Sequence, residues 1–233
     1  MLARRTAANA PPFVGKNRRF AEKSSPFVCR PVTSEHMTIV CVHRTFAEAF
    51  YNDPAVTYVL PDETIRRSVL PWFVQSVAIP ASQLCGEVYT TADGSGAALW
   101  IRPGRISAFA HMASEAMRAI PFNLDPLTVR RWNSLRAQIE RVHQRLAERP
   151  HWYLLAVRVE PTQSGKATDR VLFEPVLSRA DAEGLPCYVE TFDETLLPFY
   201  ESWGFQIAGA GRIPDGGPNF WTLMRSPNVS SRH

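Results

Sequence analysis

The sequence of 233 residues contains few cysteines and no long apolar segment. Its four cysteines, at positions 29, 41, 85 and 187, form no C-x-x-C pair and lie near no pair of histidines. Because metal sites and disulfide frameworks depend on such clustering, we predict no metal site and a reducing, cytoplasmic compartment. No apolar run reaches the roughly 18 residues of a membrane-spanning helix, so we expect no membrane partner.

Acidic residues are scarce at the N-terminus. Residues 1–30 hold seven Arg or Lys and one acid, Glu22, whereas the remainder holds 19 basic and 21 acidic residues. The net charge of +4 therefore resides in this tail, and a body of net −2 argues against nucleic-acid binding. We interpret residues 1–25 as a basic, disordered extension, with an organelle transit peptide as the alternative. Residues 26–230 are long enough for a single domain.

The first half of this domain mixes helical and strand patterns. A strand is expected at residues 27–32, and amphipathic helices are expected at residues 34–50 and 62–78. The second helix has Asp62 as its N-cap and Pro71 as an interior kink or break. Residues 86–104 predict a β-hairpin because Asp93-Gly94 is a strong turn signal.

Residues 105–150 are the most helical segment and predict a helical insertion. One apolar stripe recurs at spacings of three and four residues, at Trp132, Leu135, Ile139, Val142 and Leu146. Six arginines lie mostly off this stripe, at positions 130, 131, 136, 141, 145 and 149. We expect the stripe to pack on a sheet and the basic face to be solvated; the alternative is that the segment covers a substrate.

The C-terminal half continues with the pattern of a mixed sheet. Residues 151–159 are apolar at nearly every position, as in a strand buried on both faces. A polar loop, a helix containing Pro175 and a second strand at residues 186–192 follow. A short helix closed by Gly204 and two strands joined by residues 214–219 complete the chain. We predict a mainly antiparallel sheet with one parallel crossover and helices on both faces.

Several segments together resemble the GCN5-related N-acetyltransferase (GNAT) superfamily, particularly its small-molecule and antibiotic branch that includes puromycin N-acetyltransferase. The matching segments lie between residues 26 and 227 and read "FYNDP", "HWYLLAVRVEP", "PVLSRADAEGLPCYVET", "LPFYESWGF" and "IPDGGPNFWTLMR". The resemblance implies an α+β (α/β) fold with a mixed, mostly antiparallel sheet of about seven strands. In its middle, two parallel strands are splayed.

The resemblance also implies that acetyl-CoA binds between the splayed strands as a co-substrate. Its pantetheine arm would follow the strand segment Val157, Arg158 and Val159. Its pyrophosphate would lie on the backbone of the loop Ser164, Gly165, Lys166, Ala167, Thr168 and Asp169, beside Arg170, because helix N-termini attract phosphates.

This loop departs from the family pattern Q/R-x-x-G-x-G/A. Ser164 replaces the usual Gln or Arg, Ala167 replaces a glycine, and Asp169 adds a negative charge near the phosphates unless it turns outward and pairs with Arg170. Leu196 replaces an asparagine that often contacts the cofactor in the family. An alternative is therefore a GNAT-fold protein that no longer uses acetyl-CoA and binds, or transforms, another metabolite.

The reaction implied by the resemblance is N-acetylation of a small-molecule amine. Tyr200 matches the family tyrosine that can protonate the CoA sulfur, and Glu190 is the candidate base, acting directly or through a water. Three histidines could serve as bases but are expected to be surface or packed residues: His111, His143 and His151. Four aromatic residues could line an acceptor pocket, although core packing is their default role: Phe122, Trp132, Trp152 and Trp203. We expect a monomer or homodimer.

Overall fold

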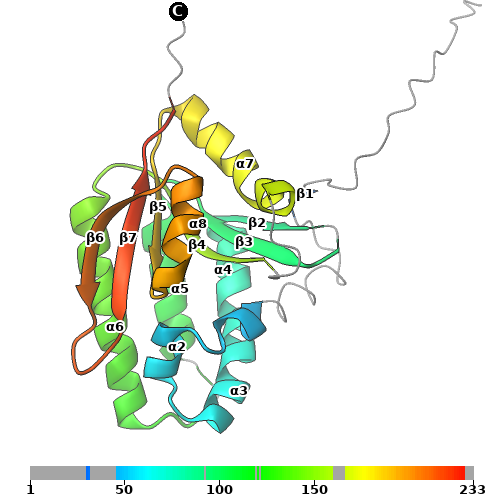
Figure 1. The fold of residues 1–233 in the computed structure, drawn as a ribbon. Helices are drawn as coiled ribbons and strands as arrows, with labels where there is room; N and C mark the ends of the chain where they lie inside the picture. The colour runs from blue at the N-terminus through cyan, green and yellow to red at the C-terminus, as the bar shows by residue number, and fades with distance from the viewer. Residues whose placement is uncertain are drawn as a thin grey trace, which may run out of the picture.

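The computed structural model describes residues 30–31, 46–91, 93–118, 120, 122–159 and 166–228. Figure 1 shows how the elements in these ranges are arranged. The predicted basic tail lies outside them, as do most of the predicted helix at residues 34–50 and the loop residues Ser164 and Gly165.

A seven-stranded sheet with the order β1-β2-β3-β4-β5-β7-β6 forms the centre of the structure. Its strands are β1 Arg30–Pro31, β2 Gly86–Thr90, β3 Gly96–Ile101, β4 Trp152–Val159, β5 Cys187–Thr191, β6 Gln206–Arg212 and β7 Asn219–Arg225. The pair β4–β5 is parallel, and the other five neighbouring pairs are antiparallel. The predicted mixed, mostly antiparallel sheet of about seven strands is confirmed.

Helices cover both faces of this sheet (Figure 1). They are α2 Pro54–Val59, α3 Glu63–Phe73, the π-helical turn η1 Val74–Ala78, α4 Ile79–Cys85, α5 Ile106–Arg118, α6 Pro126–Leu146, α7 Lys166–Glu183, the short 3-10 helix η2 Glu194–Leu196 and α8 Leu197–Ser202. The C-terminal end of α8 is closed by Gly204, whose φ of 82° is readily adopted by glycine, as predicted.

The helix that begins at Glu63 starts as the sequence predicts. Asp62 caps it by accepting a hydrogen bond from the amide of Ile65 at 2.9 Å. Pro71 does not end it, however, because the helical path continues through η1 and α4 to Cys85. Proline removes one backbone donor, and here a π-helical turn follows three residues later instead of a break.

The segment predicted as a helical insertion forms two helices, α5 and α6. Asp125 caps α6, and the apolar stripe of α6 faces inward as predicted. Trp132 and Leu135 join a cluster with α2 and α3, while Val142 packs with residues that flank or belong to β6 and β7. The arginines at positions 130, 136, 141, 145 and 149 are exposed, whereas the guanidinium of Arg131 lies over the Tyr58 ring at 5.4 Å.

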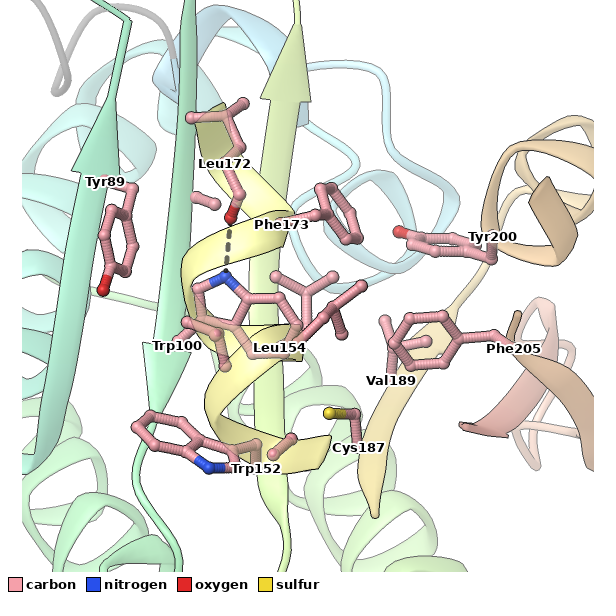
Figure 2. Close-up of a cluster of buried hydrophobic side chains, with 14 of the residues drawn as sticks. Tyr89, Trp100, Trp152, Leu154, Leu172, Phe173, Cys187, Val189, Tyr200 and Phe205 are labelled. Carbon is pink, nitrogen blue, oxygen red and sulfur yellow. Dashed lines mark hydrogen bonds between the residues drawn. The ribbon is translucent and has the colours of Figure 1, made fainter. Parts of the chain in front are cut away.

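The core on one face of the sheet lies under α7 and α8 (Figure 2). Successive strand residues point to opposite faces, so Trp100, Leu154 and Val189 all face this side. The indole Nε1 of Trp100 donates a hydrogen bond to the carbonyl oxygen of Leu172 at 3.1 Å, which fixes α7 to the sheet. Phe173 fills the space between them, stacked on Trp203 with a centroid separation of 4.9 Å.

The parallel pairing between β4 and β5 is short. It comprises Trp152 with Cys187, Tyr153 with Tyr188, and Leu154 with Val189. At this level the β3–β4 register shifts: Leu99 pairs with Ala156, whereas Trp100 pairs with Leu154. Leu155 is therefore an extra residue on β4, and a bulge of this kind bends a strand. Beyond it β4 continues to Val159 along β3 without further pairing to β5.

Replacing Phe173 by Ala should destabilise the protein by about 3–5 kcal/mol, because this fully buried ring would leave a cavity beneath α7. The free energy of unfolding, measured by urea denaturation, tests the prediction. The matched control is Leu127→Ala at an exposed position of α6, for which a change within about 0.5 kcal/mol is expected. Equal losses for the two variants would contradict this account of the core.

Candidate active site

The candidate site begins where β4 leaves β5. Val157, Arg158 and Val159 lie on this stretch and are partly buried, with Val157 and Val159 packed against the core under α7. Arg158 pairs with Ala97 of β3 on one edge of β4. On the other edge, the pairing of β4 with β5 ends at Leu154, so this stretch of β4 does not pair with β5. Backbone groups on a free strand edge can bind an extended ligand as an added strand would bind.

The N-terminus of α7 follows β4 and begins at Lys166, so the predicted loop positions Lys166, Ala167 and Thr168 form its first turn. The amides at the start of a helix carry partial positive charge and favour an anion. Asp169 is buried in this turn, and the exposed Arg170 pairs instead with Glu174 at 2.9 Å. The alternative in which Asp169 turns outward to Arg170 is therefore wrong.

A polar clasp on β2, which sequence reasoning missed, holds α7 against the sheet. Both terminal nitrogens of Arg179 bind the carboxylate of Glu87, with 2.7 Å between Nη1 and Oε1, and Nη2 also donates to the Tyr89 hydroxyl at 2.8 Å. The same guanidinium lies over Trp152 at 4.9 Å. Burial alone would raise the pKa of Glu87, but hydrogen bonds from Arg179 and Tyr89 outweigh it and lower that pKa.

Glu190 lies on β5 at the first position after the paired region. Its Oε1 accepts a hydrogen bond from the Tyr153 hydroxyl, while its Oε2 is buried and has no hydrogen-bond partner. The Tyr188 hydroxyl also faces this carboxylate, although the pair falls outside hydrogen-bond geometry. Burial raises the pKa of Glu190 to about 7, and the two tyrosines limit the rise. A carboxylate with this pKa can accept a proton near neutral pH.

Tyr200 reaches toward the same region from the other face of the sheet. It is buried in the core under α7 and α8, with its ring near those of Phe199 and Phe205. Figure 2 shows its hydroxyl directed from α8 toward the diverging strands. Burial raises the pKa of Tyr200, and the negative charges of Asp53, Glu190 and Asp193 raise it further. The hydroxyl therefore stays protonated at neutral pH and can act as a proton donor.

Two aspartates that sequence reasoning did not single out lie near this hydroxyl. Asp53 caps α2 by accepting hydrogen bonds from the amides of Ala55 and Val56. Asp193 follows β5 and caps η2. Burial raises the pKa of Asp53, and the charge of Asp193 contributes to the rise. The signals available in the sequence were the "NDP" before α2 and the "DET" after β5, both of which read as ordinary helix caps.

The predicted alternative bases lie elsewhere. His111 is exposed on α5. His143 and His151 form a pair with 2.7 Å between their Nε2 atoms, and the His143 ring stacks on Tyr188 at 4.4 Å. Burial lowers the pKa of His143 to about 4, with a smaller contribution from His151. The pair is therefore neutral near pH 7 and lies behind Tyr188 rather than at the open strand ends.

The four aromatic candidates do not form one pocket. Trp152 and Trp203 pack in the core under α7, whereas Trp132 and Phe122 belong to a cluster with α2 and α3. Leu196 is 39% exposed in η2. In the described ranges no three His, Cys, Asp or Glu side chains gather as metal ligands would. No described helix has the length and apolar character needed to span a membrane.

The chain is similar to proteins that are named as N-acetyltransferases. No family model matches the chain. The chain is 27% identical over 175 residues to an uncharacterized N-acetyltransferase of Schizosaccharomyces pombe, covering 69% of this chain and 68% of that protein. Among solved structures, arylalkylamine N-acetyltransferase 2 from Aedes aegypti has a TM-score of 0.55 at 12% identity, covering 88% of this chain and 100% of that one. An agmatine N-acetyltransferase has a TM-score of 0.53 at 18% identity, covering 86% and 99%. These structural likenesses establish a shared fold.

The raised pKa of Glu190 predicts a pH-dependent stability. Its folded pKa of about 7 exceeds the ordinary 4.5, so the folded state binds an extra proton between these pH values. Stability should therefore fall as pH rises from about 4.5 to 7. Glu190→Gln removes this dependence. The free energy of unfolding of the variant minus that of the wild type should therefore be up to about 3 kcal/mol larger at pH 8 than at pH 4. Urea denaturation across this pH range measures it.

The control for this prediction is Glu148→Gln at an exposed position after α6. Its difference from wild type should not vary with pH. A Glu190→Gln difference that is equally flat would mean that the folded protein does not hold the Glu190 carboxyl with a raised pKa.

Proposed function

We propose that this chain, which has the GCN5-related N-acetyltransferase fold, transfers the acetyl group of acetyl-CoA to the amine of a small molecule. The observation that carries the proposal is the open end of the parallel strands, which has Glu190 on one side and Tyr200 on the other. A proton acceptor and a proton donor are the two groups that this transfer requires. The named relatives that acetylate agmatine and arylalkylamines support a small amine as the acceptor.

The residues that would hold acetyl-CoA lie on the end of β4 that does not pair with β5 and in the first turn of α7. The unpaired edge at Val157–Val159 fits the extended pantetheine arm, and the N-terminal amides of α7 fit the pyrophosphate. When bound, acetyl-CoA supplies an acetyl group activated as a thioester. The helix that presents these amides is fixed to the sheet at Leu172 by Trp100 and at Arg179 by Glu87.

Two proton transfers define the roles of the side chains. An ammonium group has no lone pair, so Glu190 accepts its proton, directly or through a water, and leaves a nucleophilic amine. Glu190 can do this only when ionised, which its pKa of about 7 allows at and above neutral pH. Tyr200 donates its proton to the sulfur of the departing CoA thiolate, and its hydroxyl carries that proton at neutral pH.

The helices α5 and α6 are the candidates for the site of the amine that accepts the acetyl group. We assign the helical insertion at residues 105–150 to the wall of the acceptor site, because α6 packs against α2, whose N-cap is Asp53. The matching motifs favour the small-molecule branch of the superfamily that includes puromycin N-acetyltransferase. The loop departures at Ala167 and Asp169 are then adjustments of acetyl-CoA affinity rather than signs of its loss.

The proposal is tested by titrating the purified protein with acetyl-CoA in a calorimeter and by following CoA release with small amines. Saturable binding and turnover are expected. Tyr200→Phe should lower kcat by roughly 100-fold while leaving acetyl-CoA affinity unchanged, because the ring is kept and only the proton donor is lost. Tyr58→Phe is the matched control, since the Tyr58 hydroxyl only donates to the Pro214 carbonyl oxygen. Absence of binding at millimolar acetyl-CoA would favour the alternative of a GNAT fold without this co-substrate.

The buried Asp169 should weaken acetyl-CoA binding by repelling the diphosphate. Asp169→Asn removes the charge at nearly constant shape, and we expect affinity to rise by a few-fold to about tenfold, more at low salt than at high salt. Calorimetric titration measures the change. Glu183→Gln, at the opposite end of α7, serves as the control and should have no effect. Unchanged affinity for Asp169→Asn would place its carboxylate away from the phosphates.

A further inference from the structure

Three carboxylates at the open strand ends each have one oxygen without a hydrogen bond from a described residue. Asp53 uses Oδ1 for both of its hydrogen bonds, from Ala55 N at 2.8 Å and Val56 N at 3.2 Å. Asp193 also uses only Oδ1, for the amide and the hydroxyl of Thr195 at 2.9 and 2.7 Å. Glu190 binds Tyr153 through Oε1, and its Oε2 is buried without a partner. Each carboxylate thus has one oxygen fixed by the fold and one that no described residue binds.

The packing of the surrounding segments brings these groups together. Phe50, Tyr51 and Val56 pack on the cluster that contains Ala156 of β4, so the segment that carries Asp53 lies beside the stretch where β4 leaves β5. Phe192, which follows β5, and Tyr58 of α2 pack against the same second cluster, so the end of β5 lies near α2. Consistent with this placement, the charge of Asp193 raises the pKa of Asp53, and all three carboxylates raise that of Tyr200.

No described Lys or Arg forms an ion pair with any of the three carboxylates. The nearby arginines are directed to other groups. Arg66 is buried and donates to the Leu60 carbonyl oxygen at 2.7 Å, with its guanidinium over Tyr51. Arg131 lies over Tyr58. Asp53 and Asp193 are partly buried, and the unbound oxygen of Glu190 is fully buried. Neighbouring carboxylates without a cation repel one another, so a positively charged ligand would relieve that repulsion.

We infer that the acceptor carries two cationic nitrogens, and that Asp53 and Asp193 bind the one that does not react. Glu190 takes the proton from the nitrogen that is acetylated, whereas the two aspartates hold the second ammonium or guanidinium in its charged form. The acetylation step rests on the proposed function, but the recognition of a dication by Asp53 and Asp193 does not. The substrate class is therefore a diamine or a guanidino amine rather than a monoamine of the same length.

Putrescine and butylamine have the same carbon chain and differ in one ammonium group, so they separate charge recognition from chain burial. We expect kcat/KM to favour putrescine by about tenfold or more, since hydrogen bonds to charged groups contribute at this level. Asp53→Asn and Asp193→Asn keep the cap oxygen and remove the charge. Each variant should lose most of the putrescine preference, measured as the ratio of kcat/KM for putrescine to kcat/KM for butylamine, a ratio in which any general effect on turnover cancels.

Asp62→Asn is the matched control, because Asp62 caps α3 through a single exposed hydrogen bond and should leave the preference unchanged. Calorimetric titration with putrescine and butylamine, with CoA and without it, separates the two proposals. Putrescine binding that depends on Asp53 and Asp193 without acetyl transfer would support the inference and overturn the proposed function. Acetylation of both amines with equal kcat/KM, or a preference that survives both Asn variants, would overturn the inference and keep the function.

Discussion

The structure depends on the separation of two parallel strands. β4 and β5 pair through Leu154 and Val189 and no further, because Leu155 is an extra residue in the β3–β4 ladder and bends β4. This single-residue irregularity leaves one edge of β4 unpaired inside an otherwise continuous sheet. Everything assigned to function here lies along or beside that edge: the segment that ends at Val159, the first turn of α7, and the side chains of Glu190 and Tyr200.

Both faces of the sheet contribute to the open end, and each is held by a different kind of contact. On one face α7 is fixed by the buried core around Trp100 and by the charged clasp between Glu87 and Arg179. On the opposite face, α2 and the segment before it are fixed by apolar packing on Ala156. The donor Tyr200 comes from the first face and the carboxylate Glu190 points to the second. The separation of the strands is what allows groups from opposite faces to act on one reacting centre.

Much of the fold could be predicted from local sequence patterns. The hairpin followed from Asp93-Gly94, the start of α3 from Asp62, the inward stripe of α6 from its spacing, and the end of α8 from Gly204. These features are decided by neighbours in the sequence. The direction of Asp169 was open because burial and pairing of a helix residue depend on what packs above it. Of the two alternatives at Pro71, a kink inside the helix or a break, the break is excluded because the helical path continues through a π-helical turn to Cys85.

The candidate site could be predicted only in part, because it also depends on contacts between residues far apart in the sequence. Glu190 and Tyr200 belong to motifs, so they could be named, whereas Asp53 and Asp193 look like helix caps until the sheet brings residues 140 positions apart to one place. The bond between Tyr153 and Glu190 and the clasp of Glu87 with Arg179 join segments that no spacing rule connects. Long-range contacts of this kind decide protonation and charge balance, and these are the properties on which the chemistry depends.

In the pair of His143 and His151, one ring donates the shared hydrogen bond and the other accepts it. The Arg149 carbonyl oxygen can only accept, and it lies 2.7 Å from Nδ1 of His151, so that nitrogen carries the proton of the neutral ring. Nε2 of His151 must then accept, and Nε2 of His143 must donate across their 2.7 Å contact. Each imidazole is thus assigned one tautomer by a single backbone oxygen. The two rings packed around Tyr188 are therefore polar yet uncharged at neutral pH, so they add no positive charge beside the tyrosine that faces Glu190.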